Sequence, residues 1–163
     1  MEIQSFGLED VQPETFWYIS VNGSHFFNSS VYGNPPNYRG INTMILDPVE
    51  CVALDWHQFD TSVRGSPIAN DLLDYINYLR DGAIVLGSTS DDSAGGLEAA
   101  VKTLNTAGVS VQVAASPYDI IFRGKFAFVF QKGYPEKTVY GKASRGGHNV
   151  KIKFHLQGWY GEC

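Results

Sequence analysis

The chain has 163 residues and a formal net charge of −5, with 44% hydrophobic and 18% charged residues. This composition is that of an ordinary folded protein and excludes a chain that stays disordered. The length suits one compact domain over residues 1–163, and an acidic chain argues against a nucleic-acid partner. The sequence holds no apolar run of about 18 residues, so we expect no insertion into a membrane.

The first part of the chain predicts two hairpins. Residues 16–27, FWYISVNGSHFF, are rich in aromatic and β-branched residues and are interrupted by Asn22-Gly23, a dipeptide typical of hairpin turns. Turn-forming residues fill 28–40, which predicts a loop. INTMIL, DPVE and CVALDWHQFD follow and predict a second hairpin over 41–60.

The middle of the chain predicts helices on either side of a buried strand. Residues 66–80, SPIANDLLDYINYLR, begin with an N-cap serine and a first-turn proline, and their apolar residues recur at helical spacing. AIVLGST, residues 83–89, is a nearly continuous apolar run, typical of a strand buried on both faces. A second helix is expected over 95–107, with three residues facing inward: Leu97, Val101 and Leu104.

The last part of the chain predicts three more strands: VSVQVAA, FAFVFQ and VKIKFHLQ. In VKIKFHLQ, residues 150–157, apolar and polar residues alternate, so we expect one buried and one exposed face. Residues 134–150, YPEKTVYGKASRGGHNV, are punctuated by glycine and predict a basic loop. The order of elements predicts an α/β or α+β domain with a central strand between two helices.

The stretch GSTSDDSAGG, residues 87–96, places Asp91 and Asp92 directly after the buried strand. Ligands of open α/β sheets bind at the carboxyl ends of strands, and small residues let a ligand approach the backbone. The structural alternative is that Asp91, Asp92 or Ser93 caps the second helix. The stretch lacks the patterns of phosphate-binding loops. Neighbouring carboxylates point apart, unlike the facing pair of a glycosidase, so we expect no enzymatic activity.

A neutral sugar is the best chemical match for these residues. Sugar hydroxyls donate to a carboxylate and accept from a guanidinium, while the C–H face of the ring packs on an aromatic side chain. DIIFRGKFAFVFQKG supplies Arg123, with Lys125 two residues later. His148 is a further candidate, unless its segment is an ordinary solvated loop. No His has an acidic or Cys partner at metal-ligand spacing, so we expect neither a metal nor another cofactor.

Cys51 and Cys163 are too few for a disulfide scaffold. Cys163 could reach Cys51 or a second subunit, and two free thiols are the remaining alternative. Asn22 and Asn28 each begin an N-glycosylation acceptor triplet, which has meaning only in a secreted chain. The acidic first residues do not form a secretory signal, so the protein is either cytosolic or already processed. The two acceptor triplets favour the processed, secreted alternative.

Four segments carry a family resemblance: YRGIN (38–42), QFD (58–60), LLDYINYLRDGAIVLGSTSDDSA (72–94) and FRGKFAFVFQKG (122–133). In this order and spacing they resemble the interleukin-like EMT inducer domain. The family includes secreted cytokine-like proteins and the stem domain of a protein O-mannose N-acetylglucosaminyltransferase. The resemblance implies a compact, sandwich-like α/β domain with mixed sheets and two flanking helices, secreted or lumenal, without catalytic activity of its own.

The resemblance also implies a sugar site. In the stem domain an aspartate after the strand and an arginine of the aromatic-Arg motif hold the glycan, and the matching residues here are Asp91 and Arg123, with Asp92 beside them. A free-standing domain of this kind is similar to galactose-specific invertebrate lectins, so we expect terminal galactose as the ligand. A single sugar site binds weakly, and several sites in one assembly raise the avidity. We therefore also expect a homodimer, linked through Cys51 or Cys163.

The chain departs from the family pattern at three points. Gly124 stands where relatives commonly have an acid, Phe126 stands where they often have Trp, and most cysteines of the cytokine-like members are missing. A secreted, cytokine-like ligand for a protein receptor is therefore the second hypothesis, behind a secreted lectin.

Overall fold

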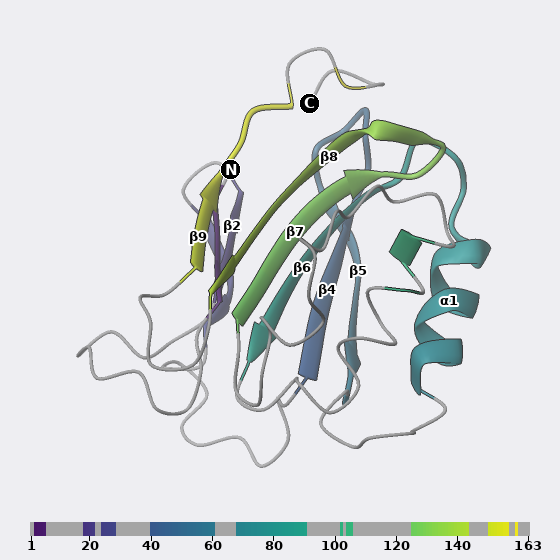
Figure 1. Ribbon diagram of the computed structural model, residues 1–163. Coiled ribbons are helices and arrows are strands. Elements are labelled where there is room, and N and C mark those ends of the chain that lie inside the picture. The colour runs from purple at the N-terminus through teal and green to yellow at the C-terminus, as the bar shows by residue number, and fades with distance from the viewer. Residues whose placement is uncertain are drawn as a thin grey trace.

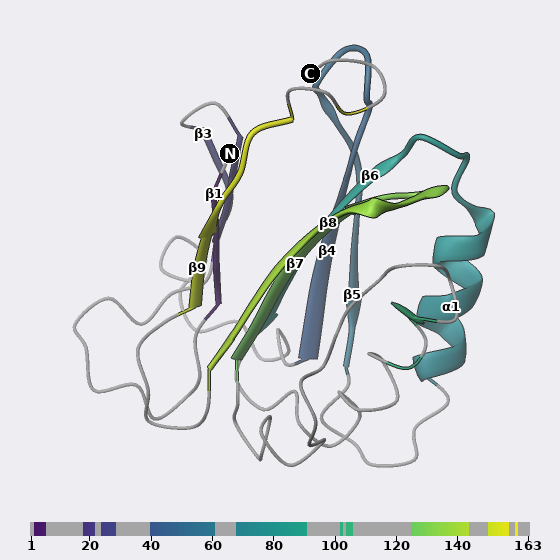
Figure 2. The same ribbon diagram turned by 45° about the horizontal axis from the view of Figure 1, so that its top comes forward.

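The structure is a computed structural model that describes residues 2–5, 18–21, 24–28, 40–60, 68–90, 102, 104–105, 125–143, 150–156 and 159. The larger of its two antiparallel sheets has the order β5-β4-β6-β7-β8, formed by Ala53–Phe59, Gly40–Leu46, Ile84–Ser90, Lys125–Gln131 and Tyr134–Ala143. The smaller sheet has the order β3-β2-β1-β9, formed by Ser24–Asn28, Tyr18–Val21, Glu2–Ser5 and Val150–Lys153. Helix α1 spans Ile68–Tyr78. Figure 2 shows three layers: the smaller sheet, the larger sheet and the helix.

The central strands β4, β6 and β7 of the larger sheet are buried on both faces, and each face has its own apolar core. On one face, α1 contributes Leu72 and Ile76 to a cluster that includes these sheet residues: Ile41, Ile45, Phe59, Val85, Phe126, Phe128 and Phe130. On the other face, the smaller sheet contributes Ile3, Ile19, Val150 and Ile152 to a cluster with Met44, Leu46, Ile84, Leu86, Ala127 and Val129. The alternation of side chains along β4 and β6 explains this division, since successive residues point to opposite faces.

Several predicted elements are confirmed. The hairpin predicted over 16–27 is β2 and β3, and the hairpin predicted over 41–60 is β4 and β5. The strand predicted over 83–89 is β6, and every residue from 83 to 89 is buried. The strand predicted over 150–157 begins with β9, an edge strand with alternating buried and exposed residues.

The predicted sandwich-like arrangement is confirmed in part. The described strands pair antiparallel in both sheets, which therefore are not mixed, and one face of the central strand β6 packs against the smaller sheet. The second predicted helix is not confirmed: of residues 95–107 only Lys102, Leu104 and Asn105 are described, and Leu104 joins the same core cluster as α1. The strand predicted at VSVQVAA lies outside the described residues.

Residues 134–150 do not form a loop throughout, because Tyr134–Ala143 is strand β8 and pairs with β7. Gly133, with φ of 82°, makes the reversal between the two strands. Apolar and polar residues do not alternate clearly along β8. The reason is that β8 is an edge strand and many of its described residues are exposed. No helix in the described part of the chain has the length and apolarity needed to cross a bilayer.

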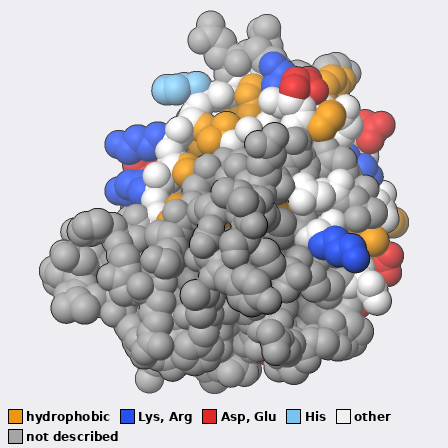
Figure 3. Space-filling model, in the orientation of Figure 1, with side chains coloured by type: hydrophobic (Ala, Val, Ile, Leu, Met, Phe, Trp, Pro, Cys, Tyr) orange, Lys and Arg blue, Asp and Glu red, His pale blue; other side chains and the backbone are white. Residues whose placement is uncertain are grey.

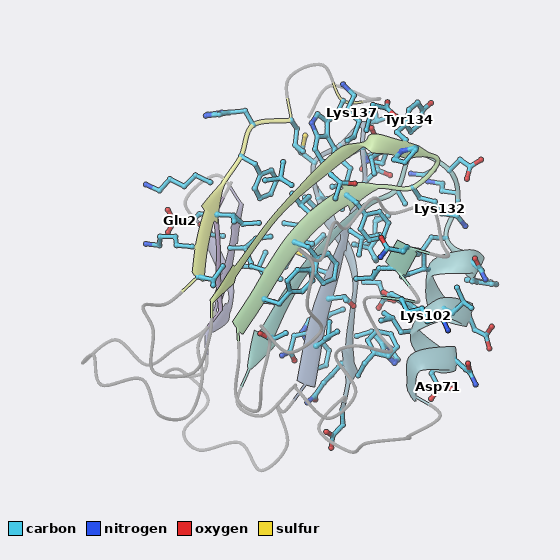
Figure 4. The ribbon with its side chains drawn as sticks, in the orientation of Figure 1. Glu2, Asp71, Lys102, Lys132, Tyr134 and Lys137 are labelled. Atoms are coloured by element: carbon cyan, nitrogen blue, oxygen red, sulfur yellow. The ribbon has the colours of Figure 1, made fainter. Side chains whose placement is uncertain are left out.

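The β4–β5 turn, α1 and the β7–β8 turn are tied together at one end of the larger sheet, called here the hairpin end (residues 47–52, 79–83 and 131–133). Figure 4 shows Lys132 beside the end of α1, where its Nζ donates to the Asn77 carbonyl at 2.7 Å and to the Leu79 carbonyl. A lysine there satisfies carbonyls left free at the end of a helix. Arg80 Nη2 donates to Asp47 Oδ2 and so ties the same region to the β4–β5 turn.

Asp47 organises the β4–β5 turn through its carboxylate. Its Oδ1 accepts the backbone N–H of Glu50 at 3.0 Å and of Val49 at 2.7 Å. These two bonds, followed by the Arg80 guanidinium, hold the pKa of Asp47 below its ordinary value, because each favours the charged carboxylate.

A lowered pKa in the folded state makes the contribution of Asp47 to stability depend on pH. The contribution is complete above the ordinary value of 3.8 and is lost as the pH falls through the folded-state pKa. We therefore expect Asp47→Asn to lower the free energy of unfolding at neutral pH, and the difference from the parent protein to shrink in acid. Urea unfolding of both proteins across acidic and neutral pH checks this. A difference that stays constant with pH would contradict it.

Candidate functional site

Antiparallel pairing brings five strand ends together at the end of the larger sheet opposite the hairpin end. β4 and β7 begin there, and β5, β6 and β8 end there, at the bottom of the sheet in Figure 1. The register fixes the neighbours: Gly40 pairs with Ser90, and Lys125 pairs with Ala143. Phe59, the last residue of β5, pairs with Ile41. We call this end of the sheet the site end, because the segments that carry most of the predicted sugar-binding residues connect to the strands here.

Four of the predicted sugar-binding residues, Asp91, Asp92, Arg123 and His148, lie outside the described residues. Lys125, the fifth, is the first residue of β7, and its backbone is described. Along the chain, Asp91 directly follows the last residue of β6, and Arg123 comes two residues before the first residue of β7. Because β6 and β7 are adjacent strands, the segments that carry the predicted pair leave neighbouring positions of the sheet.

The rule that ligands bind at the carboxyl ends of strands does not apply here, because it describes parallel sheets and the larger sheet is antiparallel. An antiparallel sheet instead mixes strand starts and strand ends at each of its ends. The site end therefore combines the exit from β6 with the entry into β7.

Thr89 ties the end of β6 to the start of β7. Its Oγ1 accepts a hydrogen bond from the backbone N–H of Phe126 at 2.8 Å, and both residues are fully or almost fully buried. The strand pairing of β6 with β7 extends to Ser88 and Ala127, so the threonine side chain takes over from the backbone beyond that point. Thr89 lies two residues before Asp91, and Phe126 three residues after Arg123.

Sequence reasoning did not single out Thr89. The signal in the sequence was the change from the apolar start of the strand to the polar run Ser88–Ser90 after Gly87. The Gly87 position is itself explained by packing, since a Cβ there would lie 2.1 Å from a ring atom of Phe128. The acceptor role of Thr89 depends on the register between β6 and β7, which the sequence does not specify.

A second polar cluster lies between β5 and α1, away from the site end strands β6 and β7. The ring of His57 lies 4.7 Å from the ring of Phe59 and 5.1 Å from the ring of Tyr75, centroid to centroid. The hydroxyl of Tyr75 donates to Asp55 Oδ2 at 3.1 Å. Burial, followed by the Asp55 carboxylate, raises the pKa of Tyr75, so the phenol stays protonated and donates. This cluster fastens the helix to the edge strand.

Among the described residues, no three His, Cys, Asp or Glu side chains come together as a metal site would require. The exposed basic residues of β9 are also compensated: Lys151 and Lys153 lie 2.8 Å and 3.2 Å from the carboxylate oxygens of Glu2. Figure 3 shows this group of blue and red side chains beside the smaller sheet. Exposed pairs of this kind contribute little to stability, and we give them no role in sugar recognition.

Comparison with known families decides the classification. The model of the interleukin-like EMT inducer family matches residues 39–134, more than half of the chain. The chain belongs to the interleukin-like EMT inducer family. The matched part contains β4, β5, α1, β6 and β7, that is, the helix and most of the larger sheet. The strands of the smaller sheet lie outside the match and are contributed by both flanks of the interleukin-like EMT inducer domain. The search of curated proteins found no match.

The bond between Thr89 and Phe126 predicts the effect of removing one hydroxyl. Thr89→Val keeps the shape of the side chain but leaves a buried N–H without its acceptor, which we expect to lower the free energy of unfolding by about 1–3 kcal/mol. Urea unfolding measures the loss. Thr89→Ser is the matched control, because it keeps Oγ and should lose less. Equal stability of the valine variant and the parent would contradict the role given to this bond.

Proposed function

We propose that the protein is a secreted, non-enzymatic carbohydrate-binding protein. Asp91 and Arg123 bind the hydroxyl groups of a terminal monosaccharide, and galactose is the expected sugar. Asp92, Lys125 and His148 flank this pair and complete the site. The proposal needs neither a metal nor a cofactor.

The observation that carries the proposal is the adjacency of β6 and β7 at the site end, in a chain of the interleukin-like EMT inducer family. The segment with Asp91 starts where β6 ends, and the segment with Arg123 runs into the start of β7. The hydrogen bond from Phe126 to Thr89 holds these two starting points together. We infer from this adjacency that an acid one residue after β6 and an arginine two residues before β7 can bind one sugar ring together.

The chemistry of the pair suits a neutral polyol. A carboxylate accepts hydrogen bonds from vicinal hydroxyls, and a guanidinium donates to the hydroxyl oxygens in a fixed fork. The charges of the Asp91 carboxylate and the Arg123 guanidinium compensate each other. The pair as a whole is therefore neutral, which suits a ligand without net charge. The remaining polar residues of the site then distinguish one sugar from another.

The direct test is a glycan array with the parent protein and Asp91→Ala. We expect binding to terminal-galactose glycans to fall by about ten- to 150-fold, because a hydrogen bond to a charged group contributes about 1.5–3 kcal/mol. Arg123→Lys should also weaken binding, since lysine lacks the fork. Asp74→Ala is the matched control, because it removes an exposed acid from α1. A blank array for the folded parent protein would contradict the proposal and favour the receptor-ligand alternative.

Cys51 lies at the hairpin end, far along the strands from the proposed site, in the turn that Asp47 organises. Cys51 is disulfide-bonded in this single chain, which contains two cysteines. We therefore propose that Cys51 bonds to Cys163 of the same chain, and that the homodimer needed for multivalent binding is held by non-covalent contacts. Two sites in one dimer raise avidity by about 10²–10⁴.

Peptide mapping and light scattering test these two statements. We expect the peptide with Cys51 to be linked to the C-terminal peptide, a monomer band on a non-reducing gel, and a dimer mass in solution. A doubled mass on the non-reducing gel that collapses with reductant would show that the disulfide joins two chains instead.

A further inference from the structure

A row of polar side chains crosses the larger sheet near the site end. Asn42 of β4 pairs with Gln58 of β5 on one side and with Ser88 of β6 on the other. Directly paired residues of antiparallel strands lie on the same face of a sheet. Gln58, Asn42 and Ser88 therefore form one row, called here the polar row. The row continues into Ala127 of β7, the partner of Ser88.

The polar row faces the smaller sheet. Met44 and Leu86, two residues away on the same strands, belong to the core cluster that also contains Ile3 and Ile19. Because side chains two residues apart on a strand share a face, Asn42 and Ser88 point into this same layer. Both are 0% exposed and so belong to the interior between the sheets, while Gln58, on the edge strand β5, is half-buried.

Polar residues are out of pattern in this layer. The neighbouring row consists of Met44, Leu86 and Val129, all apolar. Apolar side chains of similar shape would be equally or more favourable at such positions, since a buried polar group contributes little net stability even when it is hydrogen-bonded. All members of the polar row have interaction partners. Asn42 Oδ1 itself accepts no hydrogen bond from the described residues, whereas Ser88 Oγ donates to the Thr89 carbonyl at 3.5 Å and Thr89 Oγ1 accepts from the Phe126 N–H at 2.8 Å. Buried hydrogen bonds of this kind make the strand ends that they connect more rigid.

The positions of these residues in the chain show that the region made more rigid is the site end. Ser88 lies three residues before Asp91, and Ala127 lies four residues after Arg123. On the face toward the smaller sheet, the row is thus the last described row of buried side chains before the strand ends from which the proposed sugar-binding segments start. It also brings together three separate sequence motifs, because Asn42 ends YRGIN, Gln58 begins QFD, and Ser88 belongs to GSTSDD.

We propose that the polar row positions the sugar-binding side chains. Asn42 and Ser88 fix the end of β6 relative to its neighbours, and this keeps Asp91 and Arg123 at the separation that a sugar ring requires. The inference rests on the proposed function, but it assigns a role to residues that do not themselves touch the sugar. Their effect is on preorganisation, which reduces the entropy lost when the ligand binds.

The test compares polar-row variants with a buried amide at the other end of the same layer. Asn42→Leu and Ser88→Ala replace members of the row with apolar residues. Gln131→Leu is the matched control: Gln131 is 1% exposed, pairs with Ile84 of the same core cluster, and donates from Nε2 to the Gly82 carbonyl at 3.0 Å. It lies at the hairpin end.

Affinity for a galactose-terminated glycan, measured on the folded fraction, is the first readout. We expect a loss of about tenfold or more in Asn42→Leu and a smaller loss in Ser88→Ala, with no change in Gln131→Leu even if that variant is less stable. Amide hydrogen exchange is the second readout. We expect faster exchange over residues 89–93 and 121–126 in the two row variants, and parent-like exchange there in the control.

The outcomes separate this inference from the proposed function. If the parent binds the glycan and both folded row variants bind equally well, the positioning role is overturned while the lectin proposal stands. If the parent binds no glycan, the lectin proposal falls, and hydrogen exchange alone decides whether the polar row orders the site end. Unchanged exchange in both row variants would then overturn the positioning role as well.

Discussion

Each strand of the larger sheet pairs antiparallel with its neighbours, and this alternation decides which segments of the chain meet. β6 is the centre of the arrangement, with β4 on one side and β7 on the other and a core cluster on each face. The end of β6 must therefore lie beside the beginnings of both neighbours. In this way YRGIN, QFD, GSTSDD and FRGKF, distant in sequence, approach one end of the sheet.

The two ends of the larger sheet are organised differently. At the hairpin end, charged groups hold the short turns: Asp47 binds the β4–β5 turn and Arg80, and Lys132 binds the end of α1. At the site end, buried polar side chains take that role, with Thr89 bonded to the Phe126 backbone and the polar row beneath it.

The sequence predicted those elements whose local pattern is strong. The helix of α1, the hairpins of β2–β3 and β4–β5, and the buried strand β6 follow from periodicity and turn residues. β8 was not predicted, because the sequence of an exposed edge strand that contains glycine resembles that of a loop when its pairing with β7 is not known. The motif resemblance identified the family, and the pattern gave Asp91 and Arg123 as candidates. Thr89 and Asn42 could not be found, because their roles depend on cross-strand register, a property of the folded sheet.

We propose that a sugar binds at the end of the larger sheet where β6 ends and β7 begins. Titration of isotope-labelled protein with galactose, followed by backbone amide shifts, tests it directly. We expect shifts at the amides of Ile41, Thr89, Ser90, Lys125 and Phe126, and no shifts at Glu50, Cys51 and Lys132. Shifts confined to the hairpin end, or to the surface between β5 and α1, would contradict it.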